Sequence, residues 1–193
     1  MNIPLIISKG GFIMKVVLLR HAETTFNNSG RFCGRIDCDI TDNGKNITAK
    51  LASMEPFASG FTAMYVSPLK RTAQTLMAIY PNCHYIVDER LREISLGQWE
   101  GIEKMSINQD DRKAFISGLY TPPGVLENHS DVVNRIISFF VELENSYNNQ
   151  DVILVVTHNG VIRTIKQLLK MNEEKTKNSD FIIIDSKSLL KKH

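Results

Sequence analysis

Five polar side chains follow closely behind apolar runs of the sequence, near the points where those runs end. They are two arginines, two histidines and one glutamate: Arg20, His21, Arg71, Glu93 and His158. Guanidinium groups bind phosphoryl oxygens through paired hydrogen bonds, and an imidazole can attack phosphorus as a nucleophile. We therefore expect this set of residues to bind and transfer a phosphoryl group, provided that the fold brings them together.

The elements that must position these residues alternate along the chain. Apolar runs predict strands over residues 16–19, 63–66, 85–87, 152–156 and 181–184. Helical spacing predicts helices that begin near Thr41, Ser67, Glu103, Ser130 and His158. This alternation predicts one α/β domain, with a mostly parallel central sheet flanked by helices on both faces. Ligands bind beyond the carboxyl ends of strands in such folds, which is where the five polar residues lie.

Four of these helices carry specific expectations. Thr41 is expected to cap the first helix, and Ser67 is expected to cap the second with Pro68 at its first position. The side chains expected to face the core are Ile47, Leu51 and Met54 in the first helix, and Val133, Ile137, Phe140 and Leu143 in the helix after Ser130. A single helix is expected over residues 103–116.

The composition is that of one soluble domain. The chain has 193 residues, of which 42% are hydrophobic, and this suffices for a full core. Because the net charge is only +2, we expect no nucleic-acid partner. No segment reaches the roughly 20 apolar residues that span a bilayer, so we expect no membrane partner. The domain is expected over residues 14–193, and residues 1–13 are expected to be a disordered extension or a wrongly assigned start.

The cysteines and the C-terminal lysines suggest little chemistry of their own. Cys33, Cys38 and Cys83 cannot all pair within the chain, and none has the short spacing of zinc or redox motifs. A reducing cytoplasm fits this pattern best. The basic run over residues 187–192 is expected to be a solvated, frayed tail.

Five segments of the chain resemble, in the same order, the motifs of the histidine phosphatase, or phosphoglycerate mutase-like, superfamily. They are residues 19–27, 32–44, 67–75, 91–101 and 155–163. In the first segment the chain has Arg20-His21-Ala22-Glu23-Thr24, which is similar to the family's Arg-His-Gly-Glu-Thr. The resemblance implies the phosphoglycerate mutase-like fold and, within the superfamily, the branch of small phosphatases.

The resemblance also implies a role for each of the five polar residues. His21 is the nucleophile that forms a phosphohistidine, and a backbone carbonyl is expected to accept from its other ring nitrogen. Arg20, Arg71 and a protonated His158 complete the phosphate pocket. Glu93 protonates the leaving alkoxide and then, as carboxylate, activates water. Because these cations supply the positive charge, no metal and no other cofactor is expected.

Further residues of the matched motifs are expected near the phosphate. Asn27 and the backbone around Gly34 and Asn159 are expected to contact it. The chain departs from the family at Ala22, where a glycine is usual, and at Arg35, where a tryptophan is usual. Arg35 could instead meet an anionic substrate.

Several neighbouring side chains leave alternatives open. Glu89 and Glu100 lie close to Glu93 in the sequence, and either could be the acid instead. Trp99 is expected to pack beneath the loop that carries the acid rather than to bind substrate. Glu23 is expected to orient the arginines or to cap locally. Whether the loop over residues 121–129 closes over the site is open.

The reaction has to be judged from the surroundings of the motifs, because phosphatases and mutases of the superfamily share them. Cofactor-dependent phosphoglycerate mutases carry an Arg-Glu-Arg-x-Tyr-Gly segment after the acid, whereas this chain continues from Gly97–Gly101 into Ile102-Glu103-Lys104. Hydrolysis of a small phosphorylated metabolite is therefore favoured over mutase activity. Residues 32–34 and 155–163 resemble α-ribazole phosphatases of cobalamin biosynthesis most closely, with phosphoserine and sugar phosphates as rival substrates.

Two other classes of function are weaker. A non-catalytic phosphate-binding relative would not need all five catalytic-type residues, which this chain retains. A metalloenzyme that uses His21 and His158 is disfavoured because the flanking arginines repel a cation. The oligomeric state is left open by the sequence.

Overall fold

The computed structural model describes residues 13–172 and 174–191 of the chain. The strands within this part are β1 (Lys15–Arg20), β2 (Ala63–Val66), β3 (Ile86–Val87), β4 (Val152–Thr157) and β5 (Phe181–Asp185). The α-helices are α1 (Thr25–Asn28), α2 (Asp42–Ala49), α3 (Lys70–Ile79), α4 (Gln109–Ile116), α5 (His129–Ser146), α6 (Asn159–Leu168) and α7 (Ser186–Leu190). Short 3₁₀ helices are η1 (Lys50–Ser53), η2 (Glu89–Leu91), η3 (Gly97–Trp99) and η4 (Lys104–Ser106). The expected α/β fold is confirmed.

The strands form one sheet in the order β3-β2-β4-β1-β5. β1 pairs in parallel with β4, which pairs in parallel with β2, so their carboxyl ends share one edge of the sheet. β5 runs antiparallel to β1 at the other side, with Leu18 opposite Ile182. The sheet is therefore mostly parallel, and its last strand is the exception.

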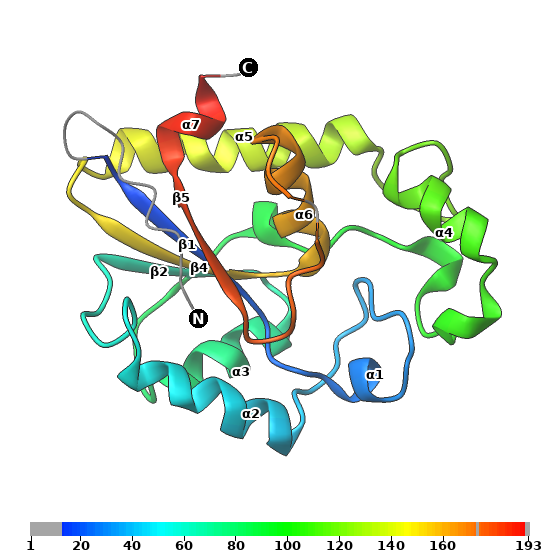
Figure 1. Cartoon of the computed structure of the whole chain (residues 1–193), viewed down its shortest axis with the longest axis horizontal. Helices are drawn as coiled ribbons and strands as arrows, with labels where there is room; N and C mark the ends of the chain where they lie inside the picture. The colour runs from blue at the N-terminus through cyan, green and yellow to red at the C-terminus, as the bar shows by residue number, and fades with distance from the viewer. Residues whose placement is uncertain (1–12, 173, 192–193) are drawn as a thin grey trace.

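Two apolar layers cover the sheet, because successive strand side chains point to opposite faces. Val16 and Leu18 belong to the larger core cluster, with buried residues of α5, α6 and α7. Val17 and Leu19 belong to the second cluster, with buried residues of η1 and α3. Figure 1 shows α5, α6 and α7 above the sheet and α2 and α3 below it. Helices on both faces are thus confirmed.

The first long helix, α2, begins as expected but turns a different face inward. Thr41 caps it, and its hydroxyl accepts a hydrogen bond from the backbone N–H of Gly44 at 2.9 Å. Ile47 and Met54 are 46% and 47% exposed, so the expected apolar face is wrong at both positions. The physical reason is that the α-helix ends at Ala49 and tightens into η1, which breaks the 3.6-residue spacing. Leu51 is buried from η1, as expected.

The second expected cap is wrong. α3 begins at Lys70, three residues after Ser67, and the N-cap Leu69 makes no side-chain capping bond. Asp37, from a distant loop, accepts from the backbone N–H of Lys70 at 3.0 Å instead. The hydroxyl of Ser67 lies 2.7 Å from Nε2 of His158, because it belongs to the polar site at the strand ends.

The long helix α5 buries a stripe that differs in part from the expected one. Asn128 caps it in a reciprocal pair with Asp131. The buried side chains are Val132, Ile136, Phe139, Phe140 and Leu143. Phe140 and Leu143 are confirmed, and the half-buried Ile137 packs against the larger core cluster as expected. The assignment of Val133 is wrong, because Val133 is half-buried and does not belong to that cluster.

The expected helix over residues 103–116 is interrupted. It is divided into η4 and α4, because Ile107 is extended and Asn108 starts a new helix by accepting from the backbone N–H of Asp110 at 2.8 Å. At the C-terminus, α7 replaces the expected frayed tail through residue 190, and Leu189 is fully buried. Most of the expected extension over residues 1–13 lies outside the described residues. None of the described helices is long and apolar enough to cross a membrane.

Candidate active site

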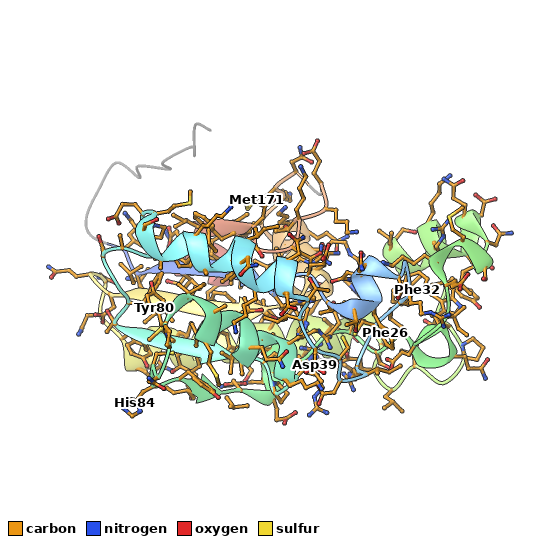
Figure 2. All side chains as sticks on the ribbon, turned by 90° about the horizontal axis from the view of Figure 1, so that it is seen from below. Phe26, Phe32, Asp39, Tyr80, His84 and Met171 are labelled. Carbon is orange, nitrogen blue, oxygen red and sulfur yellow. The ribbon has the colours of Figure 1, made fainter. Side chains whose placement is uncertain are left out.

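The parallel strands bring the two expected histidines together at one edge of the sheet. His21 follows β1 and His158 follows β4, and their ring centroids are 5.2 Å apart. The site lies at the end of the sheet toward α1. Figure 2 shows Phe26 and Phe32 at that end of the molecule, with Tyr80 and His84 toward the other end.

The ring of His21 is buried and oriented by its own neighbour. Its Nδ1 lies 2.7 Å from the carbonyl oxygen of Ala22, and the residue is 3% exposed. Because a carbonyl oxygen only accepts, the proton is assigned to Nδ1 and the lone pair to Nε2. Burial holds the pKa of His21 well below its usual value, and the charges of Arg71 and Arg20 lower it further. His21 is therefore neutral, with Nε2 able to act as a nucleophile.

His158 is also neutral, which corrects the expectation of a protonated ring. Its Nδ1 accepts from Nε of Arg71 at 3.3 Å, and its Nε2 lies 2.7 Å from the hydroxyl of Ser67. Burial lowers the pKa of His158 well below its usual value, and the charge of Arg71 adds to this. The positive charge of the site therefore comes from the arginines, and His158 supplies a hydrogen-bonding ring.

The two expected arginines are held in different ways. Arg71 is fully buried, and it donates to the carbonyl oxygens of Ile36 at 2.9 Å and Gly34 at 2.7 Å. Arg20 is 5% exposed, and its Nη1 donates to the carbonyl oxygen of Thr176 at 2.7 Å. Burial lowers the pKa of Arg20 to about 10. Its Nε is buried without a hydrogen-bond partner among the described residues, and such a group costs about 1–3 kcal/mol unless something binds it.

The carboxylate of Glu93 lies at the N-terminus of α6. Its oxygens accept from the backbone N–H groups of Ile94 at 2.9 Å and Gly160 at 3.4 Å. Glu89, by contrast, is exposed and pairs with Arg92 at 2.7 Å. Glu100 accepts from the backbone N–H of Leu96 at 3.0 Å. Among the three carboxylates, Glu93 is the one that contacts the helix that follows His158.

The residues expected around the phosphate lie in loops next to the histidines. Oδ1 of Asn27 accepts from the backbone N–H of Thr24 at 3.2 Å, which leaves the amide nitrogen of Asn27 as a donor. Gly34 has a φ of +52° in the loop whose carbonyl oxygens hold Arg71. Asn159 is the first residue of α6. Their contacts with a phosphate stay predictions.

Trp99 and Glu23 also have roles that the sequence predicts. Trp99 is buried and stacks between Phe32 and Tyr120, so its packing role is confirmed. Glu23 accepts a hydrogen bond from the hydroxyl of Thr41 at 2.8 Å, which fits the local role.

One contact to the nucleophile was missed by the sequence interpretation. The amide of Asn178 donates to the carbonyl oxygens of His21 at 3.0 Å and Ala22 at 3.2 Å, and to Oδ1 of Asn27 at 3.0 Å. Asn178 lies in a loop with no motif, so no sequence signal marks it. It ties the backbone of the nucleophile to the expected phosphate ligand Asn27.

Two lysines that lie close enough to Arg20 to feel its charge were also missed. Burial lowers the pKa of Lys175, and the charge of Arg20 lowers it further. Burial likewise lowers the pKa of Lys104, with Lys175 and Arg20 adding to the effect. Lys175 also lines a cavity of about 140 Å³, together with Ile116, Asn159, Arg163, Glu174 and Thr176. Cations thus gather around Arg20. Among residues 13–172 and 174–191, no group of three or more His, Cys, Asp or Glu side chains is placed to hold a metal ion.

Comparison with known proteins agrees with this geometry. Residues 16–187 match the histidine phosphatase superfamily (branch 1), and the chain belongs to that family. Phosphoserine phosphatase 1 from Hydrogenobacter thermophilus is 32% identical over 159 residues, which cover 79% of this chain and 74% of the relative. The metal-independent phosphoserine phosphatase of Arabidopsis thaliana is 29% identical over 161 residues, which cover 79% of this chain and 67% of the relative.

A solved structure shows the same fold. The phosphoglycerate mutase from Thermus thermophilus superposes with a TM-score of 0.75 at 24% identity, covering 89% of this chain and 93% of that one. The family and the relatives named as phosphatases support a phosphoric monoester hydrolase.

Proposed function

We propose that the protein hydrolyses a small phosphomonoester without a metal ion, through a phosphohistidine on His21. The observation that carries the proposal is the neutral, buried ring of His21, whose Nδ1 proton is held by Ala22 and which lies near two arginine charges. Nε2 of this ring has a lone pair with which to attack phosphorus.

The phosphoryl group binds between the arginines in this proposal. The unpartnered Nε of Arg20 gains an acceptor, which removes the cost of its burial. The N–H groups at the start of α6 add donors, because a helix N-terminus attracts anions. Asn27 and the backbone at Gly34 and Asn159 complete the set. These groups stabilise the charge that spreads over the equatorial oxygens during transfer.

Glu93 moves the protons of both steps. In its protonated form it gives a proton to the leaving alkoxide while Nε2 of His21 bonds to phosphorus. As a carboxylate it then takes a proton from the water that attacks the phosphohistidine, which releases inorganic phosphate and restores His21. General acid–base catalysis of this kind contributes about 10²–10⁴-fold.

Hydrolysis is favoured over phosphoryl transfer to a second substrate. The relatives with the phosphoserine phosphatase name support it, as does the absence of the mutase segment after the acid. Mutase activity and binding without turnover stay as alternatives. The free thiols Cys33, Cys38 and Cys83 favour the cytoplasm as the location.

The substrate in this proposal is a small phosphorylated metabolite. Lys104 and Lys175 near Arg20 favour one with a second acidic group, such as phosphoserine. α-Ribazole phosphate is the rival that the likeness of residues 32–34 and 155–163 supports, and sugar phosphates are a third class. Replacement of both lysines by methionine would raise KM for phosphoserine far more than for a sugar phosphate if the second acidic group matters.

The test is phosphate release from phosphoserine, phosphoglycerate, α-ribazole phosphate and sugar phosphates, with a chelator present. Wild type is expected to release phosphate, whereas His21→Ala is expected to be inactive. His84→Ala is the matched control, because His84 is exposed and lies toward the other end of the molecule (Figure 2). No release from any compound would contradict the proposal, and addition of bisphosphoglycerate would then separate a mutase from a binding protein.

A further inference from the structure

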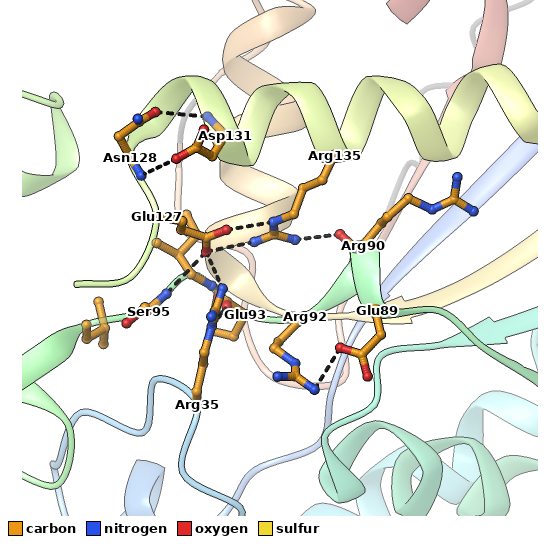
Figure 3. Close-up of polar contacts among 12 residues, drawn as sticks. Arg35, Glu89, Arg90, Arg92, Glu93, Ser95, Glu127, Asn128, Asp131 and Arg135 are labelled. Carbon is orange, nitrogen blue, oxygen red and sulfur yellow. Dashed lines mark hydrogen bonds and ion pairs between the residues drawn. The ribbon is translucent and has the colours of Figure 1, made fainter. Parts of the chain in front are cut away.

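A mostly buried carboxylate, that of Glu127, joins three segments next to the proposed acid. Oε1 of Glu127 accepts from Arg35 at 2.6 Å, from Arg135 at 3.1 Å and from the backbone N–H of Ser95 at 3.4 Å. Its other oxygen accepts from Nε of Arg135 at 3.0 Å. The side chain of Glu127 is only 10% exposed, and Figure 3 shows it between the two guanidinium groups. The loop before α5 is thereby tied down beside the site.

This cluster also holds the backbone of the acid. Nε of Arg35 donates to the carbonyl oxygen of Glu93 at 3.0 Å, and Arg135 donates to the carbonyl oxygen of Arg90 (Figure 3). Arg35 lies between Gly34 and Ile36, whose carbonyl oxygens accept from Arg71. One side chain thus connects the segment that holds the phosphate-binding arginine to the segment that holds the acid.

We propose that Arg35 and Glu127 are positioning residues that hold the carboxyl group of Glu93 at the oxygen of the leaving group. This inference rests on the proposed function. The guanidinium group of Arg35 is held by the carboxylate of Glu127 and by the carbonyl oxygen of Glu93, so we assign it to positioning rather than to binding an anionic substrate. Removing one member of a mostly buried ion pair leaves the other uncompensated, and the backbone that it holds is then free to shift.

The leaving group provides a readout that a purely structural role would not change. An alkyl phosphate needs a proton from the acid, whereas p-nitrophenyl phosphate releases a stable anion and needs little help. Glu127→Gln and Arg35→Lys are therefore expected to slow the phosphorylation step of an alkyl phosphate about tenfold or more, with a small change for p-nitrophenyl phosphate and for KM. Single-turnover measurements isolate this step.

Glu89→Gln is the matched control, since it removes an exposed ion pair from the same segment and is expected to slow neither substrate. Equal losses on the two substrates, or no loss in the variants, would overturn the inference while leaving the proposed function intact. A wild type that hydrolyses neither compound would overturn both. Thermal unfolding of each variant verifies that it folds. Glu127→Gln and Arg35→Lys change different members of the ion pair, so each tests the inference separately.

A separate observation concerns two thiols in the loop that holds Arg71. Sγ of Cys33 and Sγ of Cys38 are 2.8 Å apart, and the residues between them turn through Gly34. Cys33 is half-buried, whereas Cys38 is 6% exposed. The hydrogen bond from the thiol of Cys33 lowers the pKa of Cys38, and the charge of Arg71 lowers it further. Cys83 has no such neighbour thiol among the described residues.

We infer that Cys33 and Cys38 form a reversible disulfide when a hydroperoxide is present. The Cys38 thiolate attacks a peroxide oxygen, which yields a sulfenic acid and, for hydrogen peroxide, water after protonation. The Cys33 thiol then attacks that sulfur, the S–S bond forms and a second water leaves. The two thiols lose two electrons and two protons, and these reduce the peroxide to two waters.

Mass spectrometry tests this chemistry without reference to turnover. After exposure to hydrogen peroxide, the wild type and Cys83→Ser are expected to lose the mass of two hydrogens in the peptide that contains both Cys33 and Cys38, and dithiothreitol is expected to restore it. Cys33→Ser and Cys38→Ser are expected to show no such loss. A peptide that stays reduced, or that gains only oxygen atoms in wild type, would overturn the inference.

Discussion

Nε of Arg71 donates a hydrogen bond to Nδ1 of His158 across 3.3 Å, in the fully buried part of the site. An arginine cannot accept a proton from histidine, so this contact requires His158 to be neutral at Nδ1. The neighbouring His21 is also neutral, because burial and the charges of Arg71 and Arg20 lower its pKa. Two buried histidines that stay neutral make the free energy of unfolding depend on pH.

The free energy of unfolding is expected to fall as the pH drops below about 6.5, the ordinary pKa of histidine. The unfolded chain takes up protons there, whereas the folded histidines have depressed pKa values and do not, so stability rises with pH. The slope reaches about 1.4 kcal/mol per pH unit for each histidine, down to the depressed pKa values. Urea melts from about pH 5 to 8 measure it. His158→Gln is expected to show a smaller change of the free energy of unfolding with pH, whereas His84→Gln is expected to show the same change as wild type. A free energy of unfolding that does not change with pH in wild type would contradict the two neutral histidines.

Arg20→Met is expected to stabilise the fold and to abolish turnover. Burial of the Arg20 charge is unfavourable, as its lowered pKa indicates, so an apolar replacement is expected to raise the free energy of unfolding. Inorganic phosphate is expected to raise the Tm of wild type, because it binds only the folded state. The Tm of Arg20→Met is expected to stay the same when phosphate is added. Arg31→Met, which removes an exposed ion pair with Glu103, is expected to keep both turnover and the phosphate response. A phosphate response in Arg20→Met would contradict the assignment.

The sheet and the proposed catalytic residues were predictable because local patterns specify them. β1 and β4 are continuous apolar runs, and parallel pairing places the residues that follow them together. The buried faces of α2 and α5 were not predictable in detail. Each depends on where the helix starts or tightens, and a shift of one residue rotates the face by about 100°.

Contacts between distant loops were not predictable from any local pattern. Ser67 has the sequence context of a helix cap, yet its hydroxyl meets His158, 91 residues away in the sequence. Arg35 has the residue type of a substrate ligand, yet it pairs with Glu127, 92 residues away. Both side chains have local roles that their residue types favour, and only the tertiary fold decides which role is taken.

Asn178→Ala tests the most distant of these contacts. The amide bonds His21 and Ala22 across more than 150 residues of sequence, and its loss leaves both carbonyl oxygens without this donor. We expect a loss of stability of about 1–3 kcal/mol and a lower kcat, since the backbone of the nucleophile is less constrained. Urea melts and phosphate release measure the two effects. Asn172→Ala, an exposed asparagine of the same loop, is the control, and equal behaviour of the two variants would contradict the role of Asn178.

Leu189→Ala tests whether α7 belongs to the core. The side chain is fully buried in the larger core cluster, and truncation of such a leucine costs about 2–5 kcal/mol. Leu119→Ala is the control, because Leu119 is 84% exposed and its truncation is expected to cost little. The activity of folded Leu189→Ala is expected to stay near that of wild type. A free energy of unfolding that matches the control would restore the prediction of a frayed tail.

Gly160→Ala tests the proposed position of the acid from the opposite side. A Cβ on Gly160 would lie 2.3 Å from Oε1 of Glu93, so the carboxyl group has to move. Alanine favours a helix over glycine by about 1 kcal/mol, which offsets part of the overpacking, and the stability change is expected to be small. A displacement of about 1 Å lowers kcat about 100-fold when the displaced group is catalytic.

A double-mutant cycle with Glu93→Asp separates this clash from a general effect on α6. Aspartate is one methylene shorter and leaves room for the new Cβ, so Glu93→Asp is expected to cost less in Gly160→Ala than in wild type. The kcat values of the four proteins measure the coupling between the two positions. Additive losses would show that Gly160→Ala acts on the helix rather than on the carboxyl group, and they would return Glu100 to consideration as the acid.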